Sequence, residues 1–179
     1  MNTIQEKIVK SSKIMAIVLK AVCILLIIGL VVPIATIIWI QVDPNADINP
    51  VNGGFYSITG MPMESTGEVI AEMCTIILMA AFMLAIFIIA YSMFRTIIKD
   101  AVPFTRTNAK SIKKISVLLF IYSIVVPIAR TGFYRTFAPS IDYRGSFDET
   151  FLLLALIFYF ISIVFDYGAE LQRQSDELL

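Results

Sequence analysis

Residues 21–40 read AVCILLIIGLVVPIATIIWI, twenty consecutive residues without a charged side chain. An α-helix rises about 1.5 Å per residue, so a stretch of this length crosses the roughly 30 Å hydrocarbon core of a bilayer. A cleaved signal peptide has a shorter apolar core and a cleavage site with small residues, and this stretch has neither feature. We therefore expect a transmembrane helix that stays in the mature chain.

Three further stretches share this character, in a sequence that is 58% hydrophobic and only 16% charged. Residues 73–94 carry no charge over a full span length, whereas residues 115–129 and 150–165 are shorter and need flanking residues to cross. For the third stretch, Arg130 then lies inside the helix with its charged head turned toward the interface. The sequence thus predicts an all-α membrane protein with four transmembrane helices, at about residues 18–40, 70–95, 113–134 and 147–167.

Lysine and arginine predict the orientation of these helices, because basic residues are enriched on the cytoplasmic side of a membrane. Eleven of the 14 basic residues lie before the first span, between the second and third, or after the fourth. Both termini are therefore expected in the cytoplasm. The expected connections are an outer loop at residues 41–69, a basic cytoplasmic loop at residues 96–112 and a cytoplasmic tail at residues 168–179.

The pentapeptide VVPIA occurs at residues 31–35 and again at residues 125–129, and a lysine precedes each copy at the same distance. Two interpretations stay open: a duplicated two-helix unit, or chance in a chain rich in valine, isoleucine and alanine. Under either one, Pro33 and Pro127 each remove a backbone hydrogen bond and are expected to kink their helices. Kinked helices and repeats are typical of transporters, but no span carries a charge at mid-depth, which argues against transport.

Catalytic and metal-binding chemistry has little support in the sequence. The chain has no histidine, no glycine-rich phosphate loop and no nucleophile spaced from a base as in known motifs. Cys23 and Cys74 fall near opposite faces of the membrane if their helices are antiparallel, too far apart for a disulfide. We expect no enzyme activity, no cofactor and no metal site, and the net charge of zero predicts no direct contact with nucleic acid.

The predicted cytoplasmic side holds most of the remaining polar residues. Residues 1–20 have the pattern of a helix that lies on the inner leaflet before turning into the membrane. The second span is expected to end before Pro103, and Thr105 to cap the next helix. The three lysines at the start of that helix are candidate contacts for anionic lipid, or alternatively part of a docking surface for a protein: Lys110, Lys113 and Lys114.

The tail after the fourth span is expected to continue as a helix. Arg173 stands three residues from Glu170 and four from Glu177, spacings at which opposite charges stabilise a helix. Gly168 costs about 1 kcal/mol inside a helix, so a neighbouring span is expected to approach closely at this position.

Two segments on this side, PFTRTNAKSIKKI at residues 103–115 and YGAELQRQSDELL at residues 167–179, resemble those of a bacterial family of four-span membrane proteins. The family is a domain of unknown function, and the similarity covers essentially the whole chain. Its members are often encoded beside a Cro/C1-type helix-turn-helix regulator, so the resemblance implies a bacterial plasma membrane and such a regulator as partner. The motif positions, which are candidate partner-binding residues, are Pro103, Phe104, Asn108, Tyr167, Gly168, Glu170, Leu171 and Gln172.

Two functional hypotheses follow. The first is a non-enzymatic integral membrane protein, a membrane partner or sensor for a cytoplasmic regulator, acting through its inner loop and tail. The alternative is a small transporter, or an export or immunity component, built on the two proline-containing helices. The sequence leaves the oligomeric state open, a homo-oligomer included.

Overall fold

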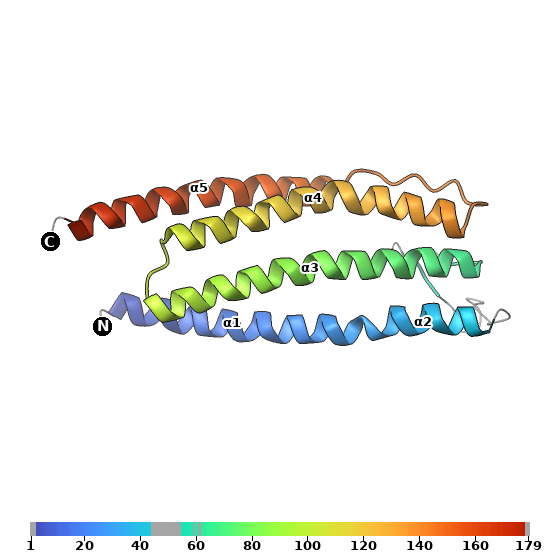
Figure 1. The fold of residues 1–179 in the computed structure, drawn as a ribbon, viewed down its shortest axis with the longest axis horizontal. Helices are drawn as coiled ribbons and strands as arrows, with labels where there is room; N and C mark the ends of the chain where they lie inside the picture. The colour runs from blue at the N-terminus through green and yellow to red at the C-terminus, as the bar shows by residue number, and fades with distance from the viewer. Residues whose placement is uncertain (1–2, 44–54, 59, 61, 178–179) are drawn as a thin grey trace.

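The computed structural model describes residues 3–43, 55–58, 60 and 62–177, so the centre of the predicted outer loop lies outside the described residues. Its α-helices are α1 (Thr3–Gly29), α2 (Val31–Val42), α3 (Thr66–Asp100), α4 (Arg106–Phe137) and α5 (Glu149–Glu177). α1 and α2 follow each other along one line, and together with α3, α4 and α5 they make four helices long and apolar enough to cross a membrane (Figure 1). The predicted all-α, four-span fold class is thereby confirmed.

Side-chain caps set where the helices begin. Ser65 Oγ accepts a backbone N–H from the first turn of α3 at 3.2 Å, and Thr105 Oγ1 does the same for α4 at 3.1 Å, as expected. Asp148 accepts a first-turn N–H of α5 at 3.3 Å, so this helix begins slightly later than the predicted fourth span. At the other end of the chain, α1 runs without interruption to Gly29, so the predicted turn from the membrane surface into the first span is wrong.

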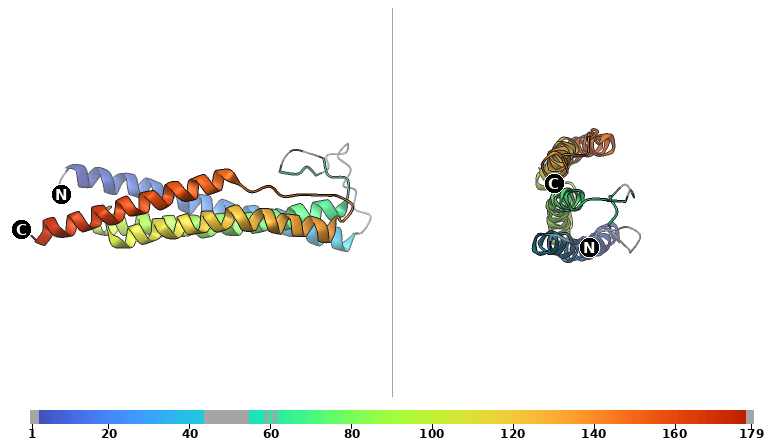
Figure 2. Two further views of the ribbon diagram at one scale, coloured as in Figure 1. Left: turned by 90° about the horizontal axis from the view of Figure 1, so that it is seen from above. Right: turned by 90° about the vertical axis from the view of Figure 1, so that its right-hand side faces the viewer.

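The helices form an open row instead of a closed bundle. Close backbone contacts join α1 and α2 to α3, α3 to α4, and α4 to α5; among the described residues, α5 has none with α1, α2 or α3. Seen end-on, the row is curved (Figure 2). In α1–α2, only 11% of the residues in the most apolar stretch of 18 are buried, and the corresponding value for α5 is also 11%. Such widely exposed apolar faces are expected where the surrounding solvent is lipid.

The two ends of the row differ in what they hold. α1 begins, α5 ends and the α3–α4 connection turns at one end, which we call the terminal end (Figure 1). The connections from α2 to α3 and from α4 to α5 lie at the opposite end, which we call the loop end.

The two prolines act differently on their helices. Pro33 has no N–H to donate to the preceding turn, and the helix is interrupted at Leu30, between α1 and α2. Pro127 lies inside α4, which continues through it. The backbone carbonyl that Pro127 leaves free is that of Ser123, and it accepts the N–H of Asp148 at 3.4 Å from the segment that leads into α5. The helix is therefore interrupted near Pro33, whereas at Pro127 it continues and the returning chain satisfies the freed acceptor. The kinks expected at both prolines stay predictions.

α3 and α4 approach closely where α3 begins and α4 ends. A Cβ atom at Gly67 would overlap the carbonyl oxygen of Phe137, whereas a Cβ at Gly132 would have nothing within 4 Å. The contact between these two helix ends thus requires a glycine at position 67.

Replacing Gly67 with alanine is expected to lower the free energy of unfolding by about 1–3 kcal/mol, because the two backbones must separate. The matched change Gly132→Ala places a methyl group in open space and is expected to be neutral or stabilising by up to about 1 kcal/mol. Unfolding in dodecyl maltoside micelles with increasing dodecyl sulfate, followed by circular dichroism, measures both. Equal stability of the two variants would contradict the close contact.

Candidate functional site

A buried ion pair joins α3 to α4 at the loop end. Glu72 of α3 is 0% exposed, and both of its carboxylate oxygens accept hydrogen bonds from Arg130 Nη2 at 3.0 Å. The Tyr134 hydroxyl donates to the same carboxylate at 3.2 Å, and the backbone N–H of Ile58 donates at 2.7 Å. An ionised carboxylate away from water requires such donors, because an unpaired buried charge costs several kcal/mol. Glu72 therefore fixes α3, α4 and the loop before α3 to one another.

Two tyrosine rings complete the surroundings of Arg130. Its guanidinium carbon lies 4.8 Å from the centroid of the Tyr143 ring, which stacks on Tyr134 with centroids 4.4 Å apart. The prediction that Arg130 lies within its helix is thus right. Its guanidinium contacts the carboxylate of Glu72 on the neighbouring helix α3, and its orientation toward the interface stays a prediction. The sequence signal for this pairing was the position of both charges at the loop-end boundary of adjacent spans.

A pocket of about 500 Å³ opens beside this ion pair. It lies between α3, α4 and the segment that leads into α5, and its polar and aromatic lining includes Thr75, Tyr122, Arg130, Tyr143, Asp148 and Glu149. Its volume is within the range of sites for small organic molecules. The pocket adjoins Pro127, one of the two prolines singled out in the sequence.

The two sequence motifs meet at the terminal end of the molecule. The Phe104 ring lies 5.0 Å from that of Phe165, and a Cβ atom at Gly168 would lie 2.8 Å from Phe104 Cδ1. Arg106 donates to Glu170 at 2.9 Å across 64 residues of sequence. The predicted close approach at Gly168 is therefore found, but the neighbour is a side chain of the α3–α4 connection instead of another span.

Pro103 and Asn108, the other motif residues of the connection, shape the turn itself. Asn108 is completely buried, and its Nδ2 donates to the Pro103 carbonyl at 2.9 Å. Its Oδ1 is buried without a hydrogen-bond partner. These two residues hold the turn between α3 and α4; Asn108 has no exposed surface, whereas Pro103 is partly exposed.

The remaining motif residues of α5 are more accessible. Tyr167 is 66% exposed and Leu171, one helical turn further on, is 49% exposed, whereas Gln172 is half-buried. These residues lie beyond the uncharged stretch that ends at Phe165. We call Phe104, Tyr167, Glu170 and Leu171 the tail surface.

Two arginines hold Glu170 in its ionised form. Arg173 donates to it at 2.7 Å and Arg106 at 2.9 Å, and these hydrogen bonds lower the pKa of Glu170 from an ordinary 4.5 to about 2. Because the pKa is lowered in the folded chain, the contact contributes fully above about pH 4.5 and is lost as the pH falls toward 2. Near neutral pH, this contact thus joins the start of α4 to the tail.

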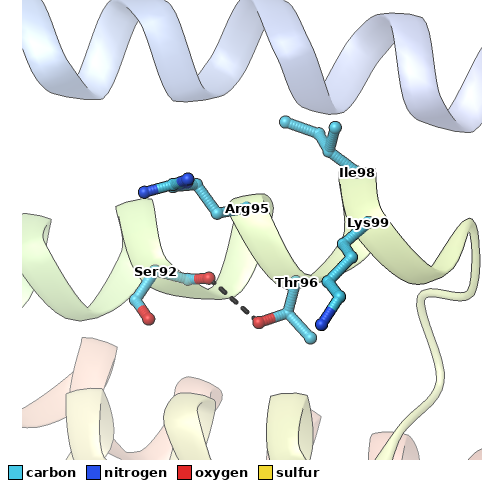
Figure 3. Close-up of a pocket in the computed structure, with 5 residues that line it drawn as sticks. All are labelled: Ser92, Arg95, Thr96, Ile98 and Lys99. Carbon is cyan, nitrogen blue, oxygen red and sulfur yellow. Dashed lines mark hydrogen bonds between the residues drawn. The ribbon is translucent and has the colours of Figure 1, made fainter.

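Basic side chains cover α3 and α4 at the same end. Lys110, Lys113 and Lys114 are exposed along the start of α4. On α3, a hollow of about 450 Å³ is lined by Ser92, Arg95, Thr96, Ile98 and Lys99. All five lining residues belong to one helix, and Thr96 Oγ1 donates back to the Ser92 carbonyl at 3.2 Å (Figure 3). The hollow is thus a feature of the helix surface and holds two cations.

Comparison of the chain with family models, curated proteins and solved structures found no match. The resemblance of its two motifs to a bacterial four-span family therefore stays a prediction. The sites described above stand on their geometry alone.

We expect the Glu72–Arg130 pair to show strong energetic coupling. Glu72→Ala or Arg130→Ala alone leaves a buried charge unpaired and is expected to cost about 3–5 kcal/mol, whereas the double variant costs less than the sum of the two. The exposed pair Asp142–Arg144, at 3.2 Å, provides the control, with an expected coupling of at most about 1 kcal/mol. Detergent unfolding of both cycles gives the coupling energies, and additive losses at Glu72 and Arg130 would contradict the buried pair.

Gly168→Ala is expected to loosen the α3–α4 connection, because the Phe104 ring must leave its place on α5. Backbone hydrogen exchange at residues 101–106, measured by mass spectrometry, should rise in this variant. Gly132→Ala, with open space around its added methyl group, should leave exchange in that segment unchanged. Identical exchange in both variants would show that Phe104 does not depend on the glycine.

Proposed function

We propose that this chain is a non-enzymatic integral membrane protein of the bacterial plasma membrane that binds a cytoplasmic regulator through the tail surface. The single observation that carries the proposal is that the two sequence motifs meet in space, through Phe104 on Gly168 and Arg106 on Glu170. Contact with lipid alone does not require two distant polar segments to be assembled into one surface outside the apolar stretches.

The distribution of basic residues supports a cytoplasmic location for this surface. Lysine and arginine gather at the terminal end, whereas residues 41–72 contain none. By the rule that basic residues stay inside, the terminal end faces the cytoplasm and the loop end faces out. A soluble regulator would then meet the tail surface first.

The chemistry of the tail surface suits a protein partner. Tyr167 and Leu171 are four residues apart on one helix, the spacing with which helices present apolar anchors to a groove. Aromatic side chains are enriched at protein interfaces, and the charges of Glu170 and Arg173 beside them supply a polar rim. A small helical domain, such as a helix-turn-helix regulator, is a partner of fitting size and chemistry.

If the protein is also a sensor, the pocket at the loop end is the site proposed for the ligand. α4 contributes Arg130 to that pocket and Arg106 to the contact with α5, so one helix of 32 residues links the two ends. A ligand that favours one position of α4 over another would thereby bias the tail surface as well.

The transport hypothesis has one observation in its favour, the pocket beside Pro127. Against it, the buried ion pair lies at the loop end, and the four uncharged stretches leave no charged side chain at mid-depth to carry an ion or proton. The partner hypothesis therefore explains more of the described surface.

Co-expression with any Cro/C1-type helix-turn-helix regulator that the gene neighbourhood encodes tests the proposal. The wild-type chain, purified in detergent, is expected to retain the regulator, and Tyr167→Ala with Leu171→Ala is expected to weaken retention by at least about tenfold, as for two interface anchors. The matched control replaces a tyrosine and an aliphatic residue at the loop end, Tyr56→Ala with Ile58→Ala, which are 55% and 52% exposed. The proposal fails if the wild type retains no regulator, or if both double variants behave alike.

A further inference from the structure

An apolar groove runs beside the three lysines of α4 at the terminal end. It has a volume of about 570 Å³ and is lined by Ile89 of α3 and by Lys110, Lys113, Lys114, Val117 and Leu118 of α4. Its accessible wall is apolar, so the lysines contribute their methylene stems to it and leave their ammonium groups for the rim.

Along this groove, charged residues are followed by apolar residues, as headgroups are followed by acyl chains in a bilayer. The lysines come first on α4, and Val117 and Leu118 continue into the uncharged stretch of that helix. Ile89 lies in the uncharged stretch of α3. The rim therefore lies at the level of lipid headgroups, and the floor lies at the level of acyl chains.

The described part of the chain supplies no anionic partner to the cations at the rim. Among the described residues, none of the three lysines forms an ion pair. Lys113 has a different contact, its Nζ lying 5.8 Å from the centroid of the Tyr159 ring of α5. Further along α3, Arg95 and Lys99 add positive charge at the same end, and Figure 3 shows Lys99 extending away from α1. A negatively charged group from outside the chain is thus favoured here.

We infer that this groove binds one anionic phospholipid. The lysine ammonium groups receive the phosphate and the anionic headgroup, and one acyl chain lies along Ile89, Val117 and Leu118. A zwitterionic lipid fits less well, because its own ammonium group would meet the lysines. A soluble phosphate ester lacks the chain that occupies the floor. The inference is independent of any regulator, since it involves neither Tyr167 nor Leu171.

Native mass spectrometry of the detergent-purified chain, titrated with dioleoyl phosphatidylglycerol or dioleoyl phosphatidylcholine, tests the site. One phosphatidylglycerol is expected to stay bound under conditions that strip phosphatidylcholine. Each Lys→Gln change at the rim is expected to weaken binding by about fivefold. Val117→Trp, at an exposed position, keeps the lysines but fills the floor of the groove, and should abolish retention of phosphatidylglycerol.

The control variant Lys7→Gln/Lys10→Gln/Lys13→Gln removes three charges, three times as many as each rim variant, from exposed positions of α1 and is expected to keep the bound lipid. Glycerophosphoglycerol, the headgroup without chains, should not compete. The inference is overturned if the α1 variant loses the lipid as readily as the groove variants, if Val117→Trp has no effect, or if phosphatidylcholine is retained equally. Circular dichroism of each variant separates lost binding from lost folding.

Discussion

A chain inside hydrocarbon must satisfy its own backbone hydrogen bonds, and this constraint leaves only the two ends of the helices for polar chemistry. The four uncharged stretches of the sequence meet it as helices, and the described ion pairs lie at the two ends. The same constraint explains the return of the chain along α4. Pro127 frees the carbonyl of Ser123, and the N–H of Asp148 satisfies it, so a backbone acceptor near the membrane does not remain empty.

The ion pairs at the two ends differ in burial, and this difference separates their roles. Glu72 is completely buried and has three donor groups around it, so the loop end is fixed by interactions that are costly to break. Arg106 and Glu170 are 67% and 33% exposed, and an ion pair of this kind contributes little because water and salt screen it. The terminal end is therefore joined more weakly than the loop end.

The sequence was sufficient to predict the elements but not all of their contacts. Uncharged stretches and their flanks predicted the four long helices, and Thr105 was interpreted correctly because capping is a local property. At Gly168 the sequence predicted a close approach but not its partner, which is the Phe104 ring and not another span. The Glu72–Arg130 pair was missed because one sequence does not say which helices are neighbours or how they are rotated. The open row was not predictable for the same reason. The apolar face of α5 is largely exposed, and an apolar face that meets lipid has the same residue pattern as one that is buried against another helix.

α4 is the element through which the two ends can communicate. In the open row it has α3 on one side and α5 on the other, and close backbone contacts of α5 are made with α4 alone among the described residues. α4 contributes Arg130 to the loop-end pocket and Arg106 to the contact with Glu170. At the terminal end the Phe104 ring lies against Gly168, where a Cβ atom would come within 2.8 Å of it. Under the proposed sensing role, a ligand that favours one position of α4 changes the tail surface through these contacts, because packed contacts have discrete arrangements.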